Sequence, residues 1–196
     1  MSMTLTTLRT RVKTRIRADL ATPTVADLHD TSITTWANEK KAEVIHLLKD
    51  AIHFPSLMVR GTALTFSSGQ ASFPSDYEIA QSVRVGSSDR RCRLFWDPDP
   101  FNRFDSSNFV VTPSSDRPLA LIADKIYIKP TSFTSGKLDY AKKHPDIASD
   151  QDTLFDELGD NVLVELIVSE YFASVVHDAA LAQSAREIAY SLARNK

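Results

Sequence analysis

The fold is decided by residues 158–176, which read LGDNVLVELIVSEYFASVV and carry eleven large apolar side chains. In the densest part of this stretch only Glu165, Ser169 and Glu170 interrupt the apolar residues. A helix that is apolar nearly all round has to be buried on nearly all sides. We therefore predict that this helix lies either at the centre of the domain or with one side covered by a neighbouring copy of the chain.

The segments that adjoin this stretch predict a polar linker before it and another helix after it. His177 and Asp178 mark a break, and residues 180–193 then predict a last helix. The apolar stripe of that helix consists of Leu181, Ala185, Ile188, Ala189 and Leu192.

The middle of the chain changes to the alternating pattern that is typical of strands. About seven strands are predicted, over residues 62–66, 70–73, 79–85, 90–96, 119–123, 126–128 and 137–141. Ser67-Ser68-Gly69 and Asp124-Lys125 are predicted hairpin turns. Because the connections are local, we expect antiparallel pairing. Residues 97–116 predict a long polar loop with a short helical turn at 99–104.

The first sixty residues predict two helices. The first has one narrow apolar stripe and ends at Pro23; its stripe is Leu5, Leu8, Val12, Ile16 and Leu20. The second covers residues 32–52 and ends before Pro55, and Asp30, Thr31 or Ser32 can cap it. Its predicted buried face contains Ile33, Trp36, Ala37, Val44, Leu47, Leu48 and Ala51.

Together these elements predict an α+β fold, in which an antiparallel β-sheet region is flanked by N-terminal and C-terminal helices packed as a small bundle. We expect a helical segment at 1–60, a β region at 61–145 with the long loop 97–116, and a C-terminal helical pair at 146–196. A chain of 196 residues is typical of one domain, so we expect the three segments to form one folded unit.

Charge is distributed unevenly along the chain, although the net charge is only −2. Residues 1–18 contain five basic residues and no acid, whereas residues 144–185 contain nine acids and neither Lys nor Arg. Such polarity favours head-to-tail contacts between copies, or a basic end that meets an acidic partner. The alternatives are two solvated faces that differ in charge, and nucleic-acid binding.

Composition excludes several classes of protein. The single cysteine excludes an internal disulfide framework and any metal site built from cysteines. No apolar run approaches the roughly 18 residues that a membrane helix needs, and the basic start has no apolar core of a secretory signal. We therefore expect a soluble protein of a reducing compartment, without a membrane partner.

The residues that carry chemistry form no recognisable catalytic or ligand-binding pattern. The five histidines are scattered, and there is neither a G-x-S-x-G sequence nor a glycine-rich phosphate loop. Cys92 lies in a predicted strand, where alternation places Arg91 and Arg93 on the opposite face, so we predict a buried structural cysteine. We expect no enzyme activity, no catalytic residue, no metal and no cofactor.

The order of the elements, with several short motifs, resembles the tailed-bacteriophage head-to-tail connector or portal adaptor family. The resemblance covers about residues 33–194. Its motifs are Trp36-Ala37-Asn38-Glu39, Phe73-Pro74-Ser75-Asp76-Tyr77-Glu78, Ala123-Asp124-Lys125-Ile126-Tyr127-Ile128-Lys129-Pro130 and Gly136-Lys137-Leu138-Asp139-Tyr140, followed by a linker with Pro145 and several Asp residues. The basic segment at residues 1–25 is not part of the pattern.

The resemblance implies a structural virion protein that is assembled in the host cytoplasm and located in the neck between capsid and tail. Copies of such proteins form a ring, commonly of twelve, which joins the portal to a tail or nozzle protein and extends the DNA channel. DNA would pass through the ring without sequence-specific binding. The alternatives are a nucleic-acid-binding module that uses the basic first helix, and another head or tail completion protein.

A ring contact needs two different complementary faces on each copy. We expect these faces to be the basic first helix and the acidic segment at residues 146–170. The candidate residues are Arg9, Arg11, Lys13, Arg15, Arg17, Asp156, Glu157, Asp160, Glu165 and Glu170. Phe101, Phe104 and Phe109 in the long loop are candidates for contact with the tail side.

Overall fold

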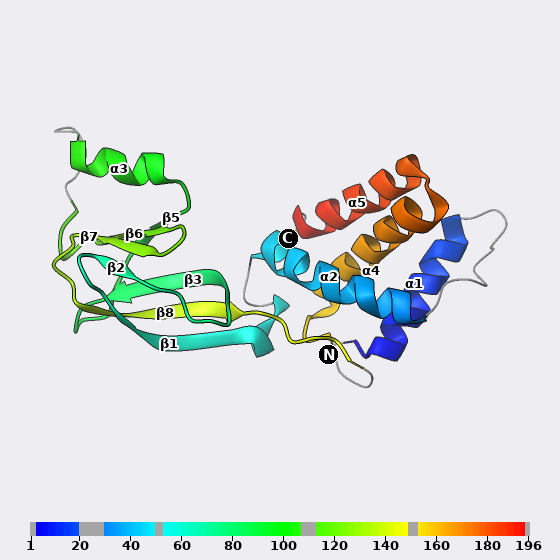
Figure 1. The fold of residues 1–196 in the computed structure, drawn as a ribbon, viewed down its shortest axis with the longest axis horizontal. Coiled ribbons are helices and arrows are strands. Elements are labelled where there is room, and N and C mark those ends of the chain that lie inside the picture. Colours follow the sequence, from blue (N-terminus) through cyan, green and yellow to red (C-terminus); the bar gives the residue numbers. More distant parts are fainter. Residues whose placement is uncertain (1–2, 20–29, 50–52, 107–112, 149–152, 195–196) are drawn as a thin grey trace. The chain divides into compact units, whose positions relative to one another are not determined.

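The computed structural model describes residues 3–19, 30–49, 53–106, 113–148 and 153–194 (Figure 1). Contacts divide the chain into two compact units, whereas one folded unit was expected from the sequence. The helical unit comprises Met1–Leu57 and Lys143–Lys196, and the β-unit comprises Met58–Lys142. The two terminal segments therefore fold together, and the β-unit is formed from the chain between them.

The described part of the helical unit contains four main helices, and the sequence 158–176 supplies the central one. They are α1 (Leu5–Asp19), α2 (Asp30–Leu48), α4 (Glu157–Tyr171) and α5 (Ala179–Arg194), with a π-helical turn (Phe172–Val176) after α4 and a short 3-10 helix (Pro55–Leu57) after α2. α4 contacts α1, α2 and α5 (Figure 1). Every residue from 162 to 168 is buried. The central position predicted for this helix is confirmed, and its burial needs no neighbouring copy.

The apolar stripes of α1 and α2 face this centre. Leu5, Leu8, Val12 and Ile16 of α1 are all buried, while Leu20 lies outside the described residues. In α2 the buried residues are Ile33, Ala37, Val44, Ile45 and Leu48. The helix ends before the predicted residue 52, since Lys49 adopts the left-handed conformation with φ 56°. Ala51 lies outside the described residues.

The break predicted at His177 and Asp178 is confirmed. His177 adopts the left-handed conformation with φ 57°, which ends the π-helical turn. Asp178 caps α5, because its Oδ1 accepts hydrogen bonds from the backbone N–H groups of Ala180 and Leu181, each at 3.0 Å. The chain thereby reverses direction, and α5 packs along α4.

The predicted stripe of α5 is confirmed in part: Ala185 and Ala189 are buried, whereas Leu181, Ile188 and Leu192 are not. The buried residues of the helix are the alanines Ala182, Ala185, Ala189 and Ala193. Ile188, by contrast, is 37% exposed. Because alanine side chains are short, they let the backbones of α4 and α5 approach closely, and the larger residues are displaced to the edge of the contact.

Across its described residues, the β-unit forms two four-stranded sheets. One has the order β1 (Met58–Thr65), β8 (Ser135–Lys142), β3 (Tyr77–Val85) and β4 (Arg90–Arg91). The other has the order β2 (Gln70–Ala71), β7 (Ile126–Lys129), β6 (Leu119–Ile122) and β5 (Arg93–Phe95). A shared core includes Leu64, Val83, Ile126, Ile128 and Leu138. With its helices and mainly antiparallel sheets, the fold is α+β as predicted.

The two strands predicted at residues 62–66 and 70–73 do not pair with each other as a hairpin. The turn does form, with a bridge between Ser67 and Gln70 and with positive φ at Ser68 and Gly69. However, β1 pairs with β8, and β2 pairs with β7 in the other sheet. The turn therefore transfers the chain from one sheet to the other, which a period-two pattern does not reveal.

The pairing of β5 with β6 is a second correction, because these two strands are parallel. A parallel pair needs a long crossover connection, and here α3 (Pro98–Ser106) and the rest of the long predicted loop provide it. The helical turn predicted at 99–104 is thus a nine-residue helix. The tight hairpin at Asp124 and Lys125 is confirmed, since β6 and β7 pair directly across it.

Candidate functional site

The basic residues near the start and middle of α1 have partners on α2. Lys13 Nζ lies 2.7 Å from Asp30 Oδ1, and Arg9 Nη1 lies 3.9 Å from Asp30 Oδ2. Arg9 also donates to Thr34 Oγ1 at 2.9 Å. The hydrogen bond from Lys13 lowers the pKa of Asp30 below its usual value. These contacts hold α1 against the first turn of α2.

Two further basic residues of α1 contact the acidic helix α4 of the same chain. Arg15 Nε donates to Glu165 Oε1 at 2.9 Å, and Arg11 Nη2 donates to Asn161 Oδ1 at 2.5 Å. Arg11 and Arg17 are themselves exposed. Part of the predicted complementarity between the basic and acidic segments is therefore satisfied within one chain, and Arg11 and Arg17 present the exposed basic charge.

Asp160 anchors the start of the described chain. Only 2% of it is exposed, and its Oδ2 accepts a hydrogen bond from the Met3 backbone N–H at 2.9 Å. Thr153 Oγ1 donates to its other carboxylate oxygen. Burial raises the pKa of Asp160 to about 6 in spite of these hydrogen bonds. The residue is placed to stabilise the helical unit, and it has almost no surface to offer a partner.

Asp156 is the N-cap of α4, and Glu157 follows it in the first turn. Asp156 Oδ1 accepts from the Gly159 N–H at 2.9 Å, and its Oδ2 lies 2.7 Å from His53 Nδ1. Negative charge at this end is favourable for the helix. Glu157 is exposed. The capping hydrogen bond and the contact with His53 account for the position of the Asp156 carboxylate, whereas the exposed Glu157 is available to a partner.

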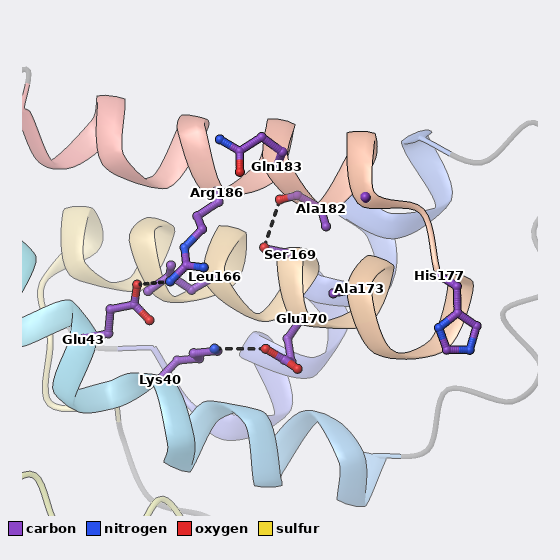
Figure 2. Close-up of a pocket in the computed structure, with 11 residues that line it drawn as sticks. Lys40, Glu43, Leu166, Ser169, Glu170, Ala173, His177, Ala182, Gln183 and Arg186 are labelled. Carbon is purple, nitrogen blue, oxygen red and sulfur yellow. Dashed lines mark hydrogen bonds and ion pairs between the residues drawn. The ribbon is translucent and has the colours of Figure 1, made fainter.

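A pocket of about 450 Å³ lies between α2, α4 and α5 (Figure 2). Lys40 Nζ lies 2.9 Å from Glu170 Oε2 on one side, and Arg186 Nη2 lies 3.3 Å from Glu43 Oε1 on the other. The hydrogen bond from Ser174 is the main cause that lowers the pKa of Glu170, and Lys40 adds to it. Each of these charges is paired, so the pocket walls are held by ion pairs between helices.

A second groove, of about 540 Å³, lies between α1, α4 and α5. Its lining is mainly apolar and includes Val164 of α4 with Ile188 and Leu192 of α5. Arg11 and Glu165 also line it. The sequence interpretation missed this groove, although the signal was present: in α5 the alanines and the larger apolar residues of the predicted stripe form two adjacent faces.

The phenylalanines of the long loop occupy different environments. Phe101 of α3 is buried against Leu119 and Leu121, and Phe104 packs against the same cluster. Phe109 lies outside the described residues. Phe101 therefore holds α3 on its sheet and has no exposed face for a tail component. Among the aromatic residues that the structure describes, Trp96 is the most exposed, at 55%.

Cys92 is buried as the sequence predicts, but it lies between β4 and β5 and not within a strand. It is only 4% exposed, while Arg91 and Arg93 are both exposed. Burial raises the pKa of its thiol to about 12. A thiol with so high a pKa is almost entirely protonated at neutral pH, and it is a poor nucleophile.

The described ranges contain no group of three or more His, Cys, Asp or Glu side chains that could hold a metal ion. Within the same ranges, no helix combines the length and the apolar character that crossing a membrane requires.

Comparison with known proteins gives one match that covers nearly the whole chain. Residues 3–195 match the family model described as SU10 adaptor protein. A search of curated proteins finds no match.

Proposed function

The chain belongs to the SU10 adaptor protein family, and from this premise we propose that it forms a ring that connects the portal of a phage head to its tail. The family consists of phage head-tail adaptors, so the chain is a structural adaptor protein of the virion that associates with other virion proteins. We propose the neck as its position, with assembly in the host cytoplasm. The family match over residues 3–195 is the observation that carries the proposal.

The proposed partners are further copies of the chain, the portal protein and a tail or nozzle protein. A closed ring with cyclic symmetry needs two different faces on each copy. We propose that α1 contributes to one of them through Arg11 and Arg17, and that Glu157 at the start of α4 is available to a further copy or to the portal, since all three are exposed. Twelve copies is the number that the family resemblance suggests.

The role proposed for DNA is passage through the ring without sequence-specific binding. The alternative function, nucleic-acid binding by the basic first helix, requires cations that are free to neutralise phosphates. Arg9, Lys13 and Arg15 instead contact acidic groups of the same chain. This observation favours the connector over the nucleic-acid-binding module.

The segment 97–116 is proposed to face the tail side. Phe101 supports this role indirectly, because it holds α3 on the sheet. Phe104 and Phe109 stay candidates for direct contact, and alanine substitution of Phe104 is expected to weaken tail attachment.

The experiment that tests the function is mass photometry of the purified chain, alone and with portal protein. We expect one discrete large species of about twelve copies, formed either alone or on the portal, and we expect negative-stain electron microscopy to show a ring with a central channel. A chain that is monomeric in both conditions and does not bind the portal would contradict the proposal.

A further inference from the structure

Trp96 is a large aromatic side chain that a rigid support presents to solvent. It is 55% exposed, the highest value among the large hydrophobic residues of the described ranges. The preceding Phe95 packs on Phe101 and Phe104, with ring centroids 6.1 and 5.5 Å apart. After it, the Asp99 N–H donates to Asp97 Oδ1 at 2.9 Å, which fixes the start of α3. Trp96 is thus held in place on both sides.

Whereas Trp96 is an exposed apolar side chain, the groove between α1, α4 and α5 is a concave apolar surface. Ile188 is 37% exposed there, and Val164 and Leu192 lie beside it. Its volume of about 540 Å³ is within the usual range for a small-ligand site. The helical unit therefore has an apolar surface that none of its described residues covers completely.

Glu165 lines this groove and has an unused hydrogen-bonding group. The residue is 8% exposed, and its Oε1 accepts from Arg15 Nε at 2.9 Å. Its Oε2 is buried and has no hydrogen-bond partner among the described residues. A buried acceptor without a donor is unfavourable, so an occupant that brings an N–H group would stabilise the site.

Charge around the two surfaces is complementary. Trp96 is followed by Asp97 and Asp99, which are both exposed. The groove is bounded by α1, which contains five basic residues and no acid up to residue 18, and the exposed Arg11 is part of its lining. An apolar centre with charges around it is the usual arrangement of a protein–protein hot spot.

We propose that Trp96 of one copy inserts into the α1–α4–α5 groove of a second copy, with its indole N–H directed to Glu165 and with Asp97 or Asp99 beside Arg11. The inference rests on the proposed function, since it names the contact between neighbouring copies in the ring. Indole is only a donor, and it needs an acceptor when it is buried. Trp96 belongs to the β-unit and the groove to the helical unit, so the contact is heterologous and each copy can bind two neighbours.

Disulfide cross-linking tests the contact directly in the full chain. The variant carries Trp96→Cys and Ile188→Cys, and the only native cysteine, Cys92, is buried and does not compete. Under mild oxidation we expect a ladder of covalent oligomers on a non-reducing gel, because every copy links to two others. The ladder should collapse to monomer on reduction.

The matched control pairs Trp96→Cys with Ser184→Cys. Ser184 is an exposed residue of the same helix, α5, and it is not part of the groove lining. We expect no ladder from this control. A covalently closed monomer from the first variant, a ladder of equal strength from the control, or cross-linking to the portal in place of a second copy would overturn the inference.

A second measurement does not depend on engineered cysteines. Ile188→Arg introduces a charge into the groove, and Val175→Arg introduces the same charge at an apolar residue that is 48% exposed and outside the groove lining. We expect Ile188→Arg and Trp96→Ala each to raise the concentration of half-assembly about tenfold or more, as loss of a hot-spot residue does. Val175→Arg should assemble as the wild type does.

The outcomes separate this inference from the proposed function. If the wild type forms rings and both Ile188→Arg and Trp96→Ala form them at the same concentration, the contact is wrong while the connector function stands. If the wild type forms no ring alone or on the portal, the connector function is wrong and the contact with it. Circular dichroism melting curves check that each variant is folded.

Discussion

At the scale of single residues, the acidic groups of this chain have distinct structural roles. Asp160 is buried beneath the start of the chain, Asp156 caps a helix, and Asp139 binds three donors in the β-unit. Sequence reading grouped Asp156 and Asp160 with the interface candidates, because a carboxylate that is needed internally and one that meets a partner look the same in a sequence. Burial and partners distinguish them.

The pKa of Asp160, raised to about 6, predicts how stability depends on pH. A carboxyl whose pKa is higher in the folded state favours folding while it is protonated. This contribution is complete below about pH 4 and is lost as the pH rises through 6. We expect Asp160→Asn to remove this contribution to the pH dependence. The unfolding free energy of the wild type, relative to that of the variant, should then fall by about 2–3 kcal/mol between pH 4 and 7.

Urea unfolding of both proteins at several pH values between 4 and 7.5 measures this difference. Because the two proteins share every other titrating group, the comparison isolates Asp160. A difference that stays constant over this range, or that changes in the opposite direction, would contradict the assignment.

Asp139 predicts a local loss of stability in the β-unit. Its carboxylate accepts from the Gly61 N–H at 2.7 Å, Ser82 Oγ at 2.6 Å and Arg84 Nη2 at 2.8 Å. Register shifts next to Gly61 and Ser82 show that it joins two irregular strands. Burial alone would raise its pKa, but these hydrogen bonds outweigh burial and lower it. We expect Asp139→Ala to cost about 1–3 kcal/mol of unfolding free energy, measured by thermal or urea unfolding.

The control for Asp139 is Asp89→Asn in the same unit, because Asp89 has a φ of 50°, a left-handed conformation that Asn tolerates and Ala does not. Asp89 lies 2.8 Å from Lys137 Nζ at the surface. Surface ion pairs contribute little to stability, so this variant should unfold like the wild type. Equal destabilisation by the two substitutions would show that charge, and not the hydrogen-bond network, explains the effect.

At the scale of elements, the helices follow the sequence more closely than the strands do. The period of α1 and α2 is read from residues within one helix, and most residues of each predicted stripe are buried. The helix α4, predicted to be apolar nearly all round, is buried at nearly every position. Strand pairing, in contrast, depends on residues that are far apart in the sequence. The pairing of β1 with β8 joins residues 70 to 83 positions apart, so a local turn at Ser67–Gln70 gave the wrong partner.

The alanine face of α5 carries a prediction about packing. Ala189 is fully buried, and α5 contacts α4 more closely than the predicted stripe suggested. We expect Ala189→Leu to force the two helices apart and to lower the free energy of unfolding by about 1–3 kcal/mol, measured by urea unfolding. Ser184→Ala, at an exposed position of the same helix, is the control and should change stability little. If Ala189→Leu leaves stability unchanged, the close approach of the two helices is not essential.

At the scale of the whole molecule, the fold class and the family could be predicted from the sequence. Which charged residues contact their own chain, and which are available to a neighbour, could not. The order of elements and the short motifs led to the head-to-tail connector family, and the family match agrees. The interface candidates were chosen by charge alone. Charge does not tell whether an arginine meets an acid in its own chain, as Arg15 meets Glu165, or in a neighbour.

This difference predicts separate effects for the arginines of α1. Arg11→Glu with Arg17→Glu changes exposed residues, so we expect rings to shift toward monomers on a sizing column while the melting temperature stays close to that of the wild type. Arg15→Glu instead places a carboxylate beside Glu165, and we expect it to lower the melting temperature. If the first variant keeps its rings intact, α1 has no part in the contact between copies.

The β-unit begins at Met58 and ends at Lys142, and Met58 pairs with Ala141 on the neighbouring strand. Its entrance and exit are thus adjacent, as in an insertion that has been placed in a single loop of a host protein. An insertion of this kind can be shortened, enlarged or exchanged without a change in how the helices of the helical unit are connected. Variation of the β-unit among related chains would then require changes in only one continuous stretch of gene.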